Sequence, residues 1–291
     1  MSQNASELPH LLTVKEVADL LRVKERKVYD MAAAGEIPHR RLTGRLLFPE
    51  PEISAWIAGD SGRNTDIRPD VFTGSHDPLL DWAMRESGSG LAALIDGSSD
   101  GLERFAAGEA ALCGLHVPED EGWNLETVQA RGLKEVVLTS WATRQQGLLL
   151  AKGISDTDGM AVLRGRRIAL RQPGAGGRAL FDRLLAEAGL VQADLEIAET
   201  VARTESEIAA NIASGEAEVA LGLECMARQF GLGFVPLVQE QFDLLADRRA
   251  WFTEPVQKLI RFTRTSAFIG KAETLGGYDV STLGQVRWLS R

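Results

Sequence analysis

The sequence contains few of the residues that build disulfide-linked or metal-centred folds. Its 291 residues include two cysteines, four histidines and two tyrosines. Cys113 and Cys225 stand alone in apolar surroundings, without CxxC spacing or nearby histidines, so we expect buried reduced thiols. Because no histidines have the HxxxH spacing or accompany paired cysteines, we expect no metal site.

Long apolar runs are also missing. No stretch approaches the ~20 consecutive apolar residues needed to cross a bilayer, and residues 1–10 lack the positive start and apolar core of a signal peptide. We therefore expect a cytoplasmic protein. The composition, 44% hydrophobic and 25% charged, is ordinary for a globular chain, and the length allows two or three domains.

The N-terminal segment has the pattern of two short helices joined by a tight turn. Thr13 precedes a helix and Glu16 follows three residues later, which is the spacing of a capping box. After a break at residues 22–24, a second helix is predicted from Glu25 to Ala34, with Gly35 as its stop. The inward residues expected in the two helices are Val17, Leu20 and Leu21, then Val28, Met31 and Ala32.

A basic hairpin and a third helix are predicted next. Residues 37–42 and 45–48 flank the Thr43-Gly44 turn as two strands, and a closing helix spans residues 49–57. Residues 11–58 in this order resemble the excisionase and MerR-like winged helix-turn-helix family, although a small helical cap that touches no DNA is the alternative. The candidate DNA contacts are Lys24, Arg26, Lys27, Tyr29, Arg40, Arg41 and Arg45.

Charge is unevenly distributed along the chain. Residues 13–48 hold eight basic and five acidic side chains, a balance of +3, whereas the whole chain carries −9 and the remainder therefore −12. Phosphate contacts need clustered cations, and an acidic body discourages DNA from binding elsewhere. Two such heads in a homodimer, or in a higher even oligomer, would double the positive charge and read two half-sites.

The predicted domain organisation is a DNA-binding head, a linker and a two-lobed body. The small, polar residues 59–66 predict a linker, so the domains are 1–60, a linker at 61–68, and 69–291. Lobe I takes in about 69–150 and 240–291, and lobe II about 151–239. Strand and helix patterns alternate through the body, which favours an α/β fold with parallel sheets.

Specific segments carry this alternation. Asp77-Pro78 opens a helix whose buried face is Leu79, Leu80, Trp82 and Ala83, and Asn124 is expected to cap another. The predicted strands are 70–73, 91–95, 110–115, 134–143, 146–151, 166–170, 195–199, 218–221, 234–238 and 242–247. The remaining predicted helices are 98–108, 124–131, 176–188, 205–214 and 254–264, with Leu180, Phe181, Leu184 and Leu185 inward.

Loops after these strands are candidates for a ligand site. Ligands of open α/β folds bind at the carboxyl ends of strands, and helix N-termini attract anions. We expect six loops, at Ser75, Ser98, His116, 171–178, Thr204 and Gly222, to converge in one cleft between the lobes. The candidate ligand-binding residues are Ser75, His76, Ser98, Ser99, His116, Arg171, Arg178, Thr204 and Glu205.

The body also resembles a known family. The runs GSHD at 74–77, GEAALCGLH at 108–116, QQGLLLA at 145–151, RQPGAGGR at 171–178 and GYD at 277–279 resemble the periplasmic-binding-protein-like domain of one-component bacterial regulators. That domain is similar to transporter proteins that bind molybdate or tungstate. The resemblance implies a two-lobed, type II fold in which Ser75, and Ser98 or Ser99, hold an oxyanion.

Alternatives stay open for each candidate. The serines also suit plain helix caps, the histidines structural hydrogen bonds, and Arg171 and Arg178 surface salt bridges. The two arginines depart from the neutral lining of the transporter proteins, and an arginine fork would suit a small carboxylate. The glycine run at 174–177 lacks the Lys-Ser/Thr of a Walker motif, so no nucleotide cofactor is expected.

The sequence as a whole predicts a ligand-responsive transcriptional regulator. A winged head would bind double-stranded DNA, and the body would sense a small anion such as molybdate or tungstate. Ser75, His76 and Asp77 are sequence neighbours, which is not how a catalytic triad is built, and no other catalytic constellation is present. The alternatives are an enzyme of molybdenum cofactor metabolism and an architectural DNA-binding protein.

Overall fold

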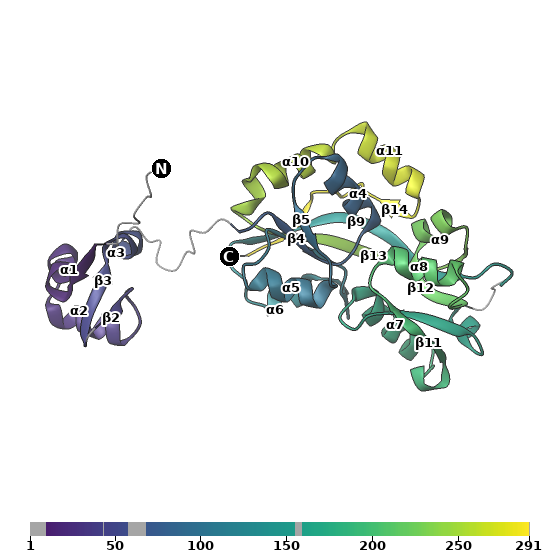
Figure 1. Cartoon of the computed structure of the whole chain (residues 1–291), viewed down its shortest axis with the longest axis horizontal. Coiled ribbons are helices and arrows are strands. Elements are labelled where there is room, and N and C mark those ends of the chain that lie inside the picture. Colours follow the sequence, from purple (N-terminus) through teal and green to yellow (C-terminus); the bar gives the residue numbers. More distant parts are fainter. Residues whose placement is uncertain (1–9, 43, 58–67, 155–158, 291) are drawn as a thin grey trace, which may run out of the picture. The chain divides into compact units, whose positions relative to one another are not determined.

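The computed structural model describes residues 10–42, 44–57, 68–154 and 159–290. The chain divides into two compact units, Met1–Asp66 and Ile67–Arg291 (Figure 1). These are called the head and the body below, and each is described by itself. Most of the predicted linker, residues 61–67, lies outside the described residues. Every helix among the described residues is too short or too polar to span a bilayer.

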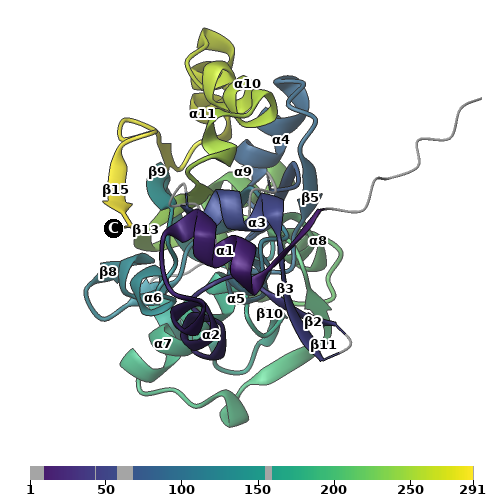
Figure 2. The same ribbon diagram turned by 90° about the vertical axis from the view of Figure 1, so that its left-hand side faces the viewer.

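The head begins with the two predicted helices. In α1 (Val14–Leu21) the capping box is confirmed, because Thr13 N–H donates to Glu16 Oε2 at 2.7 Å and Glu16 N–H donates to Thr13 Oγ1 at 3.4 Å. Arg22 ends this helix in the left-handed region, and α2 (Glu25–Ala33) follows at a steep angle to it (Figure 2). The prediction for Leu20 is wrong: it is 54% exposed, because Val14, Val17 and Ala18 form the buried stripe of α1.

The predicted hairpin is part of a three-stranded sheet. Strands β2 (Arg40–Leu42) and β3 (Arg45–Pro49) form the wing, and β1 (Leu11–Thr13) adds to the other side of β3. Strand β1 has three residues, too few for an alternating pattern, so the sequence did not predict it. The closing helix α3 (Glu50–Ala55) packs Ile53 into the head core, and Trp56 Nε1–H donates to Glu36 O at 2.8 Å.

The body is built on one mixed sheet that runs through both lobes. Its strand order is β11-β10-β12-β9-β13-β6-β4-β5, with β14 and β15 also paired to β9. Strands β4 (Val71–Gly74), β5 (Ala92–Leu94) and β6 (Leu112–Leu115) are parallel in lobe I. Strands β10 (Arg167–Arg171), β11 (Glu196–Ala202) and β12 (Val219–Leu223) are parallel in lobe II.

Two long antiparallel strands connect the lobes, which corrects the expectation of parallel sheets throughout. The predicted strands 134–143 and 146–151 are one strand, β9 (Val136–Leu150), and 234–238 and 242–247 are likewise one, β13 (Gly233–Asp247). They pair with each other over nearly their whole length. Each long strand was predicted as two strands, because polar residues near its middle interrupt the apolar pattern.

Helices cover the sheet in both lobes (Figure 1). Their bounds in lobe I are α4 (Pro78–Glu86), α5 (Ser98–Ala106), α6 (Leu125–Ala130), α10 (Glu254–Phe262) and α11 (Ser266–Leu275). In lobe II they are α7 (Gly176–Glu187), α8 (Glu205–Ala213) and α9 (Glu224–Phe230). The sequence patterns did not predict α9 or α11.

Short elements complete the body. Strands β7 (Pro118–Glu119) and β8 (Gly122–Trp123) form a separate ribbon, and β14 (Tyr278–Asp279) and β15 (Val286–Leu289) pair with β9. Single 3-10 turns are η2 (Gly159–Leu163), η3 (Gln192–Asp194) and η4 (Ala250–Phe252). The architecture of a winged helix-turn-helix head and a two-lobed α/β body is confirmed.

Each lobe has its own core, and β9 contributes to both. In lobe I, Trp141 of β9 packs with Phe72, Phe242 and Phe268, and in lobe II, Leu148 and Leu149 pack under α7 and α8 respectively. The predicted inward residues Leu79, Leu80, Ala83, Leu180, Phe181 and Leu185 are buried, whereas Trp82 and Leu184 are half-buried. Cys113 and Cys225 are buried free thiols, as expected.

The predicted cap of α6 has a different role. Asn124 stands before α6 with a positive φ of 68°, but its side chain makes no cap hydrogen bond. Its Oδ1 accepts from Val117 N–H at 2.6 Å, and its Nδ2 donates to Asp243 Oδ2 at 2.7 Å. Asn124 therefore holds β13 against the segment after β6, a contact that sequence spacing could not indicate.

We predict that the contact between α5 and β4 tolerates no side chain at position 101. A Cβ on Gly101 would approach the backbone of Gly74 well inside 3.0 Å, whereas one on Gly270 in α11 would meet nothing within 4 Å. Gly101→Ala should therefore lower the free energy of unfolding by ~1–3 kcal/mol through overpacking. Gly270→Ala, the control, should raise it by up to ~1 kcal/mol. Equal urea midpoints for the two variants would contradict this packing.

Candidate functional site

The predicted DNA-contacting side chains lie on one helix and one hairpin of the head. Arg26, Lys27 and Tyr29 are exposed on α2, whose buried face is formed by Val28, Met31 and Ala32. Lys24 occupies the N-cap position of α2, and Arg41 and Arg45 are exposed on the wing. Arg40 is exposed too, but it donates to Glu52 Oε1 at 2.7 Å, so part of its charge is neutralised within the head.

In the body, the loops after β4 and β5 bring two predicted serines together. Ser75 Oγ and Ser98 Oγ lie 2.7 Å apart and share a hydrogen bond. His116, which follows β6, donates its backbone N–H to Ser98 Oγ at 3.3 Å. All three residues are buried, and each follows the carboxyl end of a strand in lobe I. The structure therefore joins three of the predicted loops at one edge of the sheet.

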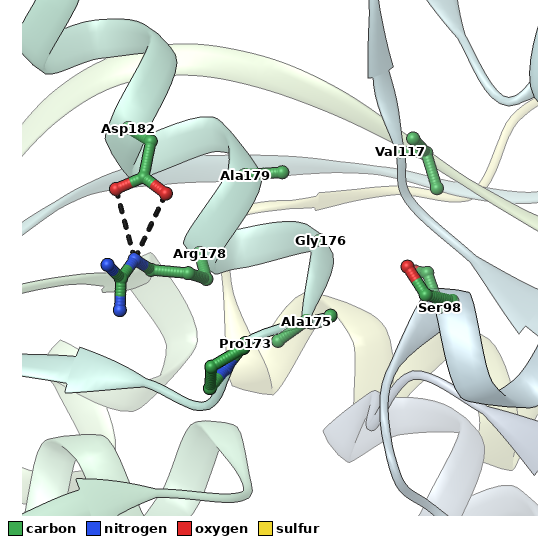
Figure 3. Close-up of a pocket in the computed structure, with 10 residues that line it drawn as sticks. Ser98, Val117, Pro173, Ala175, Gly176, Arg178, Ala179 and Asp182 are labelled. Carbon is green, nitrogen blue, oxygen red and sulfur yellow. Dashed lines mark hydrogen bonds and ion pairs between the residues drawn. The ribbon is translucent and has the colours of Figure 1, made fainter.

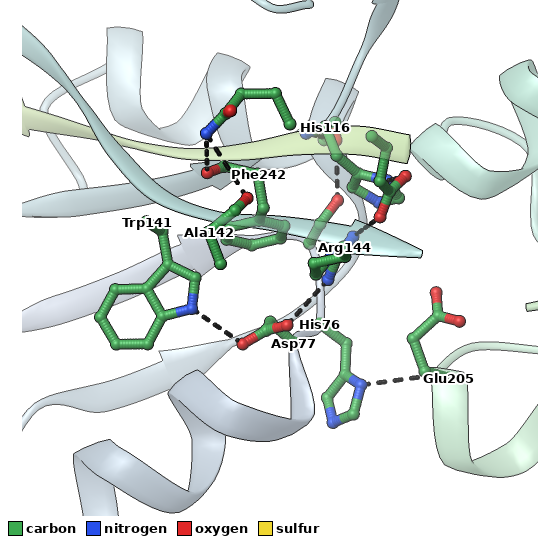
Figure 4. Close-up of polar contacts among 12 residues, drawn as sticks. His76, Asp77, His116, Trp141, Ala142, Arg144, Glu205 and Phe242 are labelled. Atoms are coloured by element: carbon green, nitrogen blue, oxygen red, sulfur yellow. Dashed lines mark hydrogen bonds and ion pairs between the residues drawn. The ribbon is translucent and has the colours of Figure 1, made fainter. Parts of the chain in front are cut away.

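Asp77 is the most connected group of this edge, although the sequence showed it only as a helix cap. Its Oδ1 accepts from Leu80 N–H at 2.7 Å, as predicted for a cap, and from Trp141 Nε1–H at 3.0 Å. Its Oδ2 accepts from Arg144 NH1 at 2.9 Å (Figure 4). The same oxygen accepts from Tyr278 O–H at 2.7 Å. One carboxylate therefore links α4 to β9 and β14.

Arg144, Glu240 and His116 continue this network. The Arg144 guanidinium forms an ion pair with Glu240, whose other oxygen lies 2.9 Å from His116 Nδ1. Burial alone would raise the pKa of Glu240, but the positive charge of Arg144 and the contact with His116 outweigh it and lower that pKa to about 2. The hydrogen bonds thus run in a continuous chain from Ser75 through Ser98, His116, Glu240 and Arg144 to Asp77.

Lobe II contributes a second set of the predicted residues. Arg171, at the end of β10, is ion-paired with Glu205 and donates to Arg203 O at 2.9 Å. Thr204 caps α8, because its Oγ1 accepts from Glu207 N–H at 3.0 Å. Arg171 and Glu205 are both buried. The charge of Arg171 is therefore already balanced inside lobe II.

The charge of Arg178 is also balanced by a partner within lobe II, so the arginine fork considered from the sequence is not formed. Its Nε donates to both oxygens of Asp182 at 3.0 and 3.1 Å, and its NH2 donates to Gln192 Oε1 at 2.7 Å. Arg178 and Arg171 point to different partners, so the structure does not bring them together as a fork. Gly222 also departs from its expected place, because it lies within β12 rather than in a loop.

A pocket of about 310 Å³ lies between the loops of the two lobes (Figure 3). Ser98 and Val117 stand on the lobe I side, across from Arg178, which turns toward Asp182. Ser99 also lines it, so of the predicted ligand residues this pocket gathers three: Ser98, Ser99 and Arg178. The complete lining is Ser98, Ser99, Val117, Pro173, Gly174, Ala175, Gly176, Arg178, Ala179 and Asp182.

Comparison with known families decides what kind of body this is. A model described as "PBP superfamily domain" matches residues 80–264, more than half of the chain. The chain belongs to the PBP superfamily. A second model, described as "Helix-turn-helix domain", matches residues 11–61, so the two domains seen in the structure correspond to two known families.

Individual relatives of this PBP-superfamily protein are distant. The "Uncharacterized protein YvgK" of Bacillus subtilis is 23% identical over 94% of this chain and 96% of its own. A solved phosphate transporter substrate-binding protein with bound phosphate, from Clostridium perfringens, has a TM-score of 0.53 and 12% identity, covering 70% of this chain and 96% of that one. This structural likeness shows the fold. A helix-turn-helix head joined to such a body suggests a ligand-binding, DNA-binding regulator rather than an enzyme.

The two lobes of this PBP-superfamily body are in direct contact across the site. Ser99 N–H, at the start of α5, donates to Gly174 O at 3.2 Å, and Glu205 N–H, at the start of α8, donates to His76 Nδ1 at 3.4 Å (Figure 4). Burial lowers the pKa of His76, which favours the neutral ring that this acceptor role needs. A helix N-terminus of each lobe is therefore met by an acceptor from the other lobe.

Three residues of the buried network were missed by sequence reasoning. Arg144, Glu240 and Tyr278 join the site only because β9, β13 and β14 are neighbours in the sheet: Arg144 is the cross-strand partner of both others. The available signal was a charged residue between the two predicted strands 134–143 and 146–151, which are one strand in the structure. Within the described residues, no group of three or more His, Cys, Asp or Glu side chains is placed to hold a metal ion.

We predict that a methyl group at position 176 keeps the lobes apart. A Cβ on Gly176 would overlap the carbonyl oxygen of His116 in the other lobe, and it would lie only 2.9 Å from two carbons of the His116 ring. Gly176→Ala should therefore speed hydrogen exchange at the Ser99 and Glu205 amides, which donate across the lobes.

Gly177→Ala is the matched control for this experiment. It adds the same methyl group to the same helix, but its nearest neighbours would lie at 3.9 Å, an ordinary contact. Protection of the two amides should stay at the wild-type level in this variant. Equal protection in Gly176→Ala and Gly177→Ala would show that the lobe contact does not depend on position 176.

Proposed function

We propose that this protein is a DNA-binding transcriptional regulator whose body binds a small oxyanion, with molybdate and tungstate as the first ligands to test. One observation carries the ligand proposal: adjoining loops of the two lobes carry serine hydroxyls and helix N-terminal N–H groups. Ser75 Oγ and Ser98 Oγ lie 2.7 Å apart. The Ser99 N–H donates to Gly174 O, and the Glu205 N–H donates to His76 Nδ1. An anion bound between the lobes would place its oxygens where Gly174 O and His76 Nδ1 now accept from these N–H groups.

The charge balance of the site supports an oxyanion over a carboxylate. A carboxylate fork needs a free arginine, whereas Arg171 is paired with Glu205 and Arg178 with Asp182. Hydroxyls and backbone amides can hold a tetrahedral anion without a counter-charge, because their dipoles are fixed by the fold. A small organic carboxylate remains the second candidate, since Arg178 lines the pocket with Ser98 and Ser99.

Regulation would follow from unequal ligand affinity for two arrangements of the lobes. A ligand that contacts both lobes favours the closed arrangement by its differential binding free energy. In a homodimer, closure would alter how two heads present their recognition helices to DNA. An enzyme of molybdenum cofactor metabolism is disfavoured, because the buried acids of the site are all paired with arginines.

The DNA-binding face can be tested by removing two exposed cations of α2. Arg26→Ala combined with Lys27→Ala should weaken binding to a selected duplex by ~1–3 kcal/mol for each side chain that reads a base. Arg85→Ala removes an exposed charge from the body instead and serves as the control. Fluorescence anisotropy at fixed salt measures all three proteins. Wild-type affinity in the double variant would overturn the assignment of this face.

The ligand can be tested by thermal melting of the full chain with single anions. At 100 times its dissociation constant, a ligand adds ~2.7 kcal/mol to the stability of the folded state. Molybdate and tungstate should each raise the melting temperature, and Ser75→Ala should reduce both shifts together.

The control for this test is Ser87→Ala, which removes a hydroxyl at the far end of α4, where Ser87 donates to Met84 O. Both oxyanion shifts should persist in this variant. If formate or a small dicarboxylate raises the melting temperature and molybdate and tungstate do not, the ligand is a carboxylate rather than a metal oxyanion. No shift with any anion would contradict the anion-sensing proposal.

A further inference from the structure

The side chain of Gln146, in β9, is buried without a hydrogen-bond partner. It is 1% exposed, and neither its amide nitrogen nor its amide oxygen has a partner among the described residues. Its cross-strand neighbours, Leu223 of β12 and Val238 of β13, are apolar. An unpaired buried amide is destabilising, whereas an apolar side chain of similar shape is not. Gln146 therefore lowers the stability of the ligand-free fold, and such a group calls for an explanation.

A second unpaired donor lies two residues away in the same strand. Nε of Arg144 is buried without a partner among the described residues, although the other two guanidinium nitrogens are paired with Asp77 and Glu240. Side chains alternate across a strand, so Arg144 and Gln146 project from the same face of β9. Two buried N–H donors without acceptors therefore occupy neighbouring positions where β9 passes from the core of lobe I to that of lobe II.

Glu240 lies beside the Gln146 amide but does not satisfy it. The two residues are diagonal neighbours, because Glu240 faces Arg144 and Val238 faces Gln146. Burial raises the pKa of Glu240, and Arg144 and the Gln146 amide are among the groups that lower it. The Glu240 oxygens are nevertheless bonded to Arg144 and His116, and no hydrogen bond of normal geometry joins them to the amide.

His116 connects this buried position to the pocket between the lobes. Its Nδ1 lies 2.9 Å from Glu240, and its ring lies close to Gly176, since a Cβ on Gly176 would be 2.9 Å from two ring carbons. Gly176 begins α7 and lines the 310 Å³ pocket together with Ser98 (Figure 3). The N-cap residue of α7, Ala175, offers no side-chain cap, so the positive end of this helix faces the same seam.

We propose that Gln146 is a ligand-contacting residue, which donates its amide N–H to an oxygen of the anion bound between the lobes. The proposal rests on the proposed function, because it takes the ligand to be an oxyanion. When the lobes separate, His116 of lobe I leaves Gly176 of lobe II, and the anion in the pocket reaches the amide. The amide carries no charge, so it suits an oxyanion in the same way as the serine hydroxyls do.

Thermal melting of the full chain with Gln146→Met tests this role, because methionine keeps the length of the side chain and removes its polar atoms. Without any anion, the variant should melt at least ~2 °C above the wild type, since it loses an unpaired buried amide. Molybdate, tungstate, phosphate and sulfate are then titrated against both proteins. Each anion that shifts the wild type should bind the variant about 10- to 100-fold more weakly.

Gln145→Met is the matched control in the neighbouring position. The Gln145 amide is satisfied, because its Nε2 donates to Val238 O at 3.0 Å and to Gln146 O at 3.2 Å. Without anion, Gln145→Met should melt below the wild type, since it loses both hydrogen bonds. Its affinity for each anion should equal that of the wild type.

The outcomes separate this role from the proposed function. If ligand-free Gln146→Met melts below the wild type, the amide stabilises the fold and the proposal is overturned. A higher melting temperature with unchanged anion affinity would also overturn it. If no anion shifts the wild type, the oxyanion function fails, and the ligand-free melting temperatures still show whether the fold carries an unpaired amide at Gln146.

Discussion

The buried ion pairs of Arg144 are the interaction on which the rest of the body depends. Its guanidinium is fully buried, and a buried charge is strongly destabilising unless it is paired and hydrogen-bonded. Asp77 and Glu240 supply the two carboxylates, and the Phe242 ring lies 4.4 Å from the guanidinium carbon. Burial alone would lower the pKa of Arg144, but the two carboxylates outweigh it and raise that pKa. Arg144 therefore stays charged and holds its partners in place.

The ion pairs of Arg144 connect β9 to β13 and to the start of α4. Arg144 and Glu240 are cross-strand neighbours in β9 and β13, the strands that pass between the lobes, and Asp77 follows the serine loop. Ser75, Ser98 and His116 extend this chain of hydrogen bonds from Glu240 to the loops after β4 and β5. A ligand that reorients the two hydroxyls would therefore act on the connecting strands through a continuous set of hydrogen bonds. The proposed lobe closure would then have a physical route, in which the ligand biases two discrete arrangements.

Local patterns predicted local structure well. The capping box at Thr13, the Asp77-Pro78 helix start and the glycine-rich start of α7 are contained within a few residues, so spacing alone could predict them. Ser75, Ser98 and His116 were predicted to meet because the carboxyl ends of neighbouring strands share one edge of a sheet. The pairs Arg171–Glu205 and Arg144–Glu240 were not predicted, because their members are 34 and 96 residues apart and meet only through sheet order. A single sequence does not reveal that order, either for the parallel neighbours β10 and β11 or for the antiparallel neighbours β9 and β13.

In a ligand-responsive regulator, ligand binding to the body must change the affinity of the head for DNA. The most direct measurement is the affinity of the wild-type chain for a duplex selected from random sequences, with and without a saturating anion that stabilises the body. Coupling free energies between two sites are typically ~1–3 kcal/mol, so the dissociation constant should change by about 5- to 150-fold. The same dissociation constant in both conditions would contradict a ligand-responsive regulator, even if the anion and the DNA each bind.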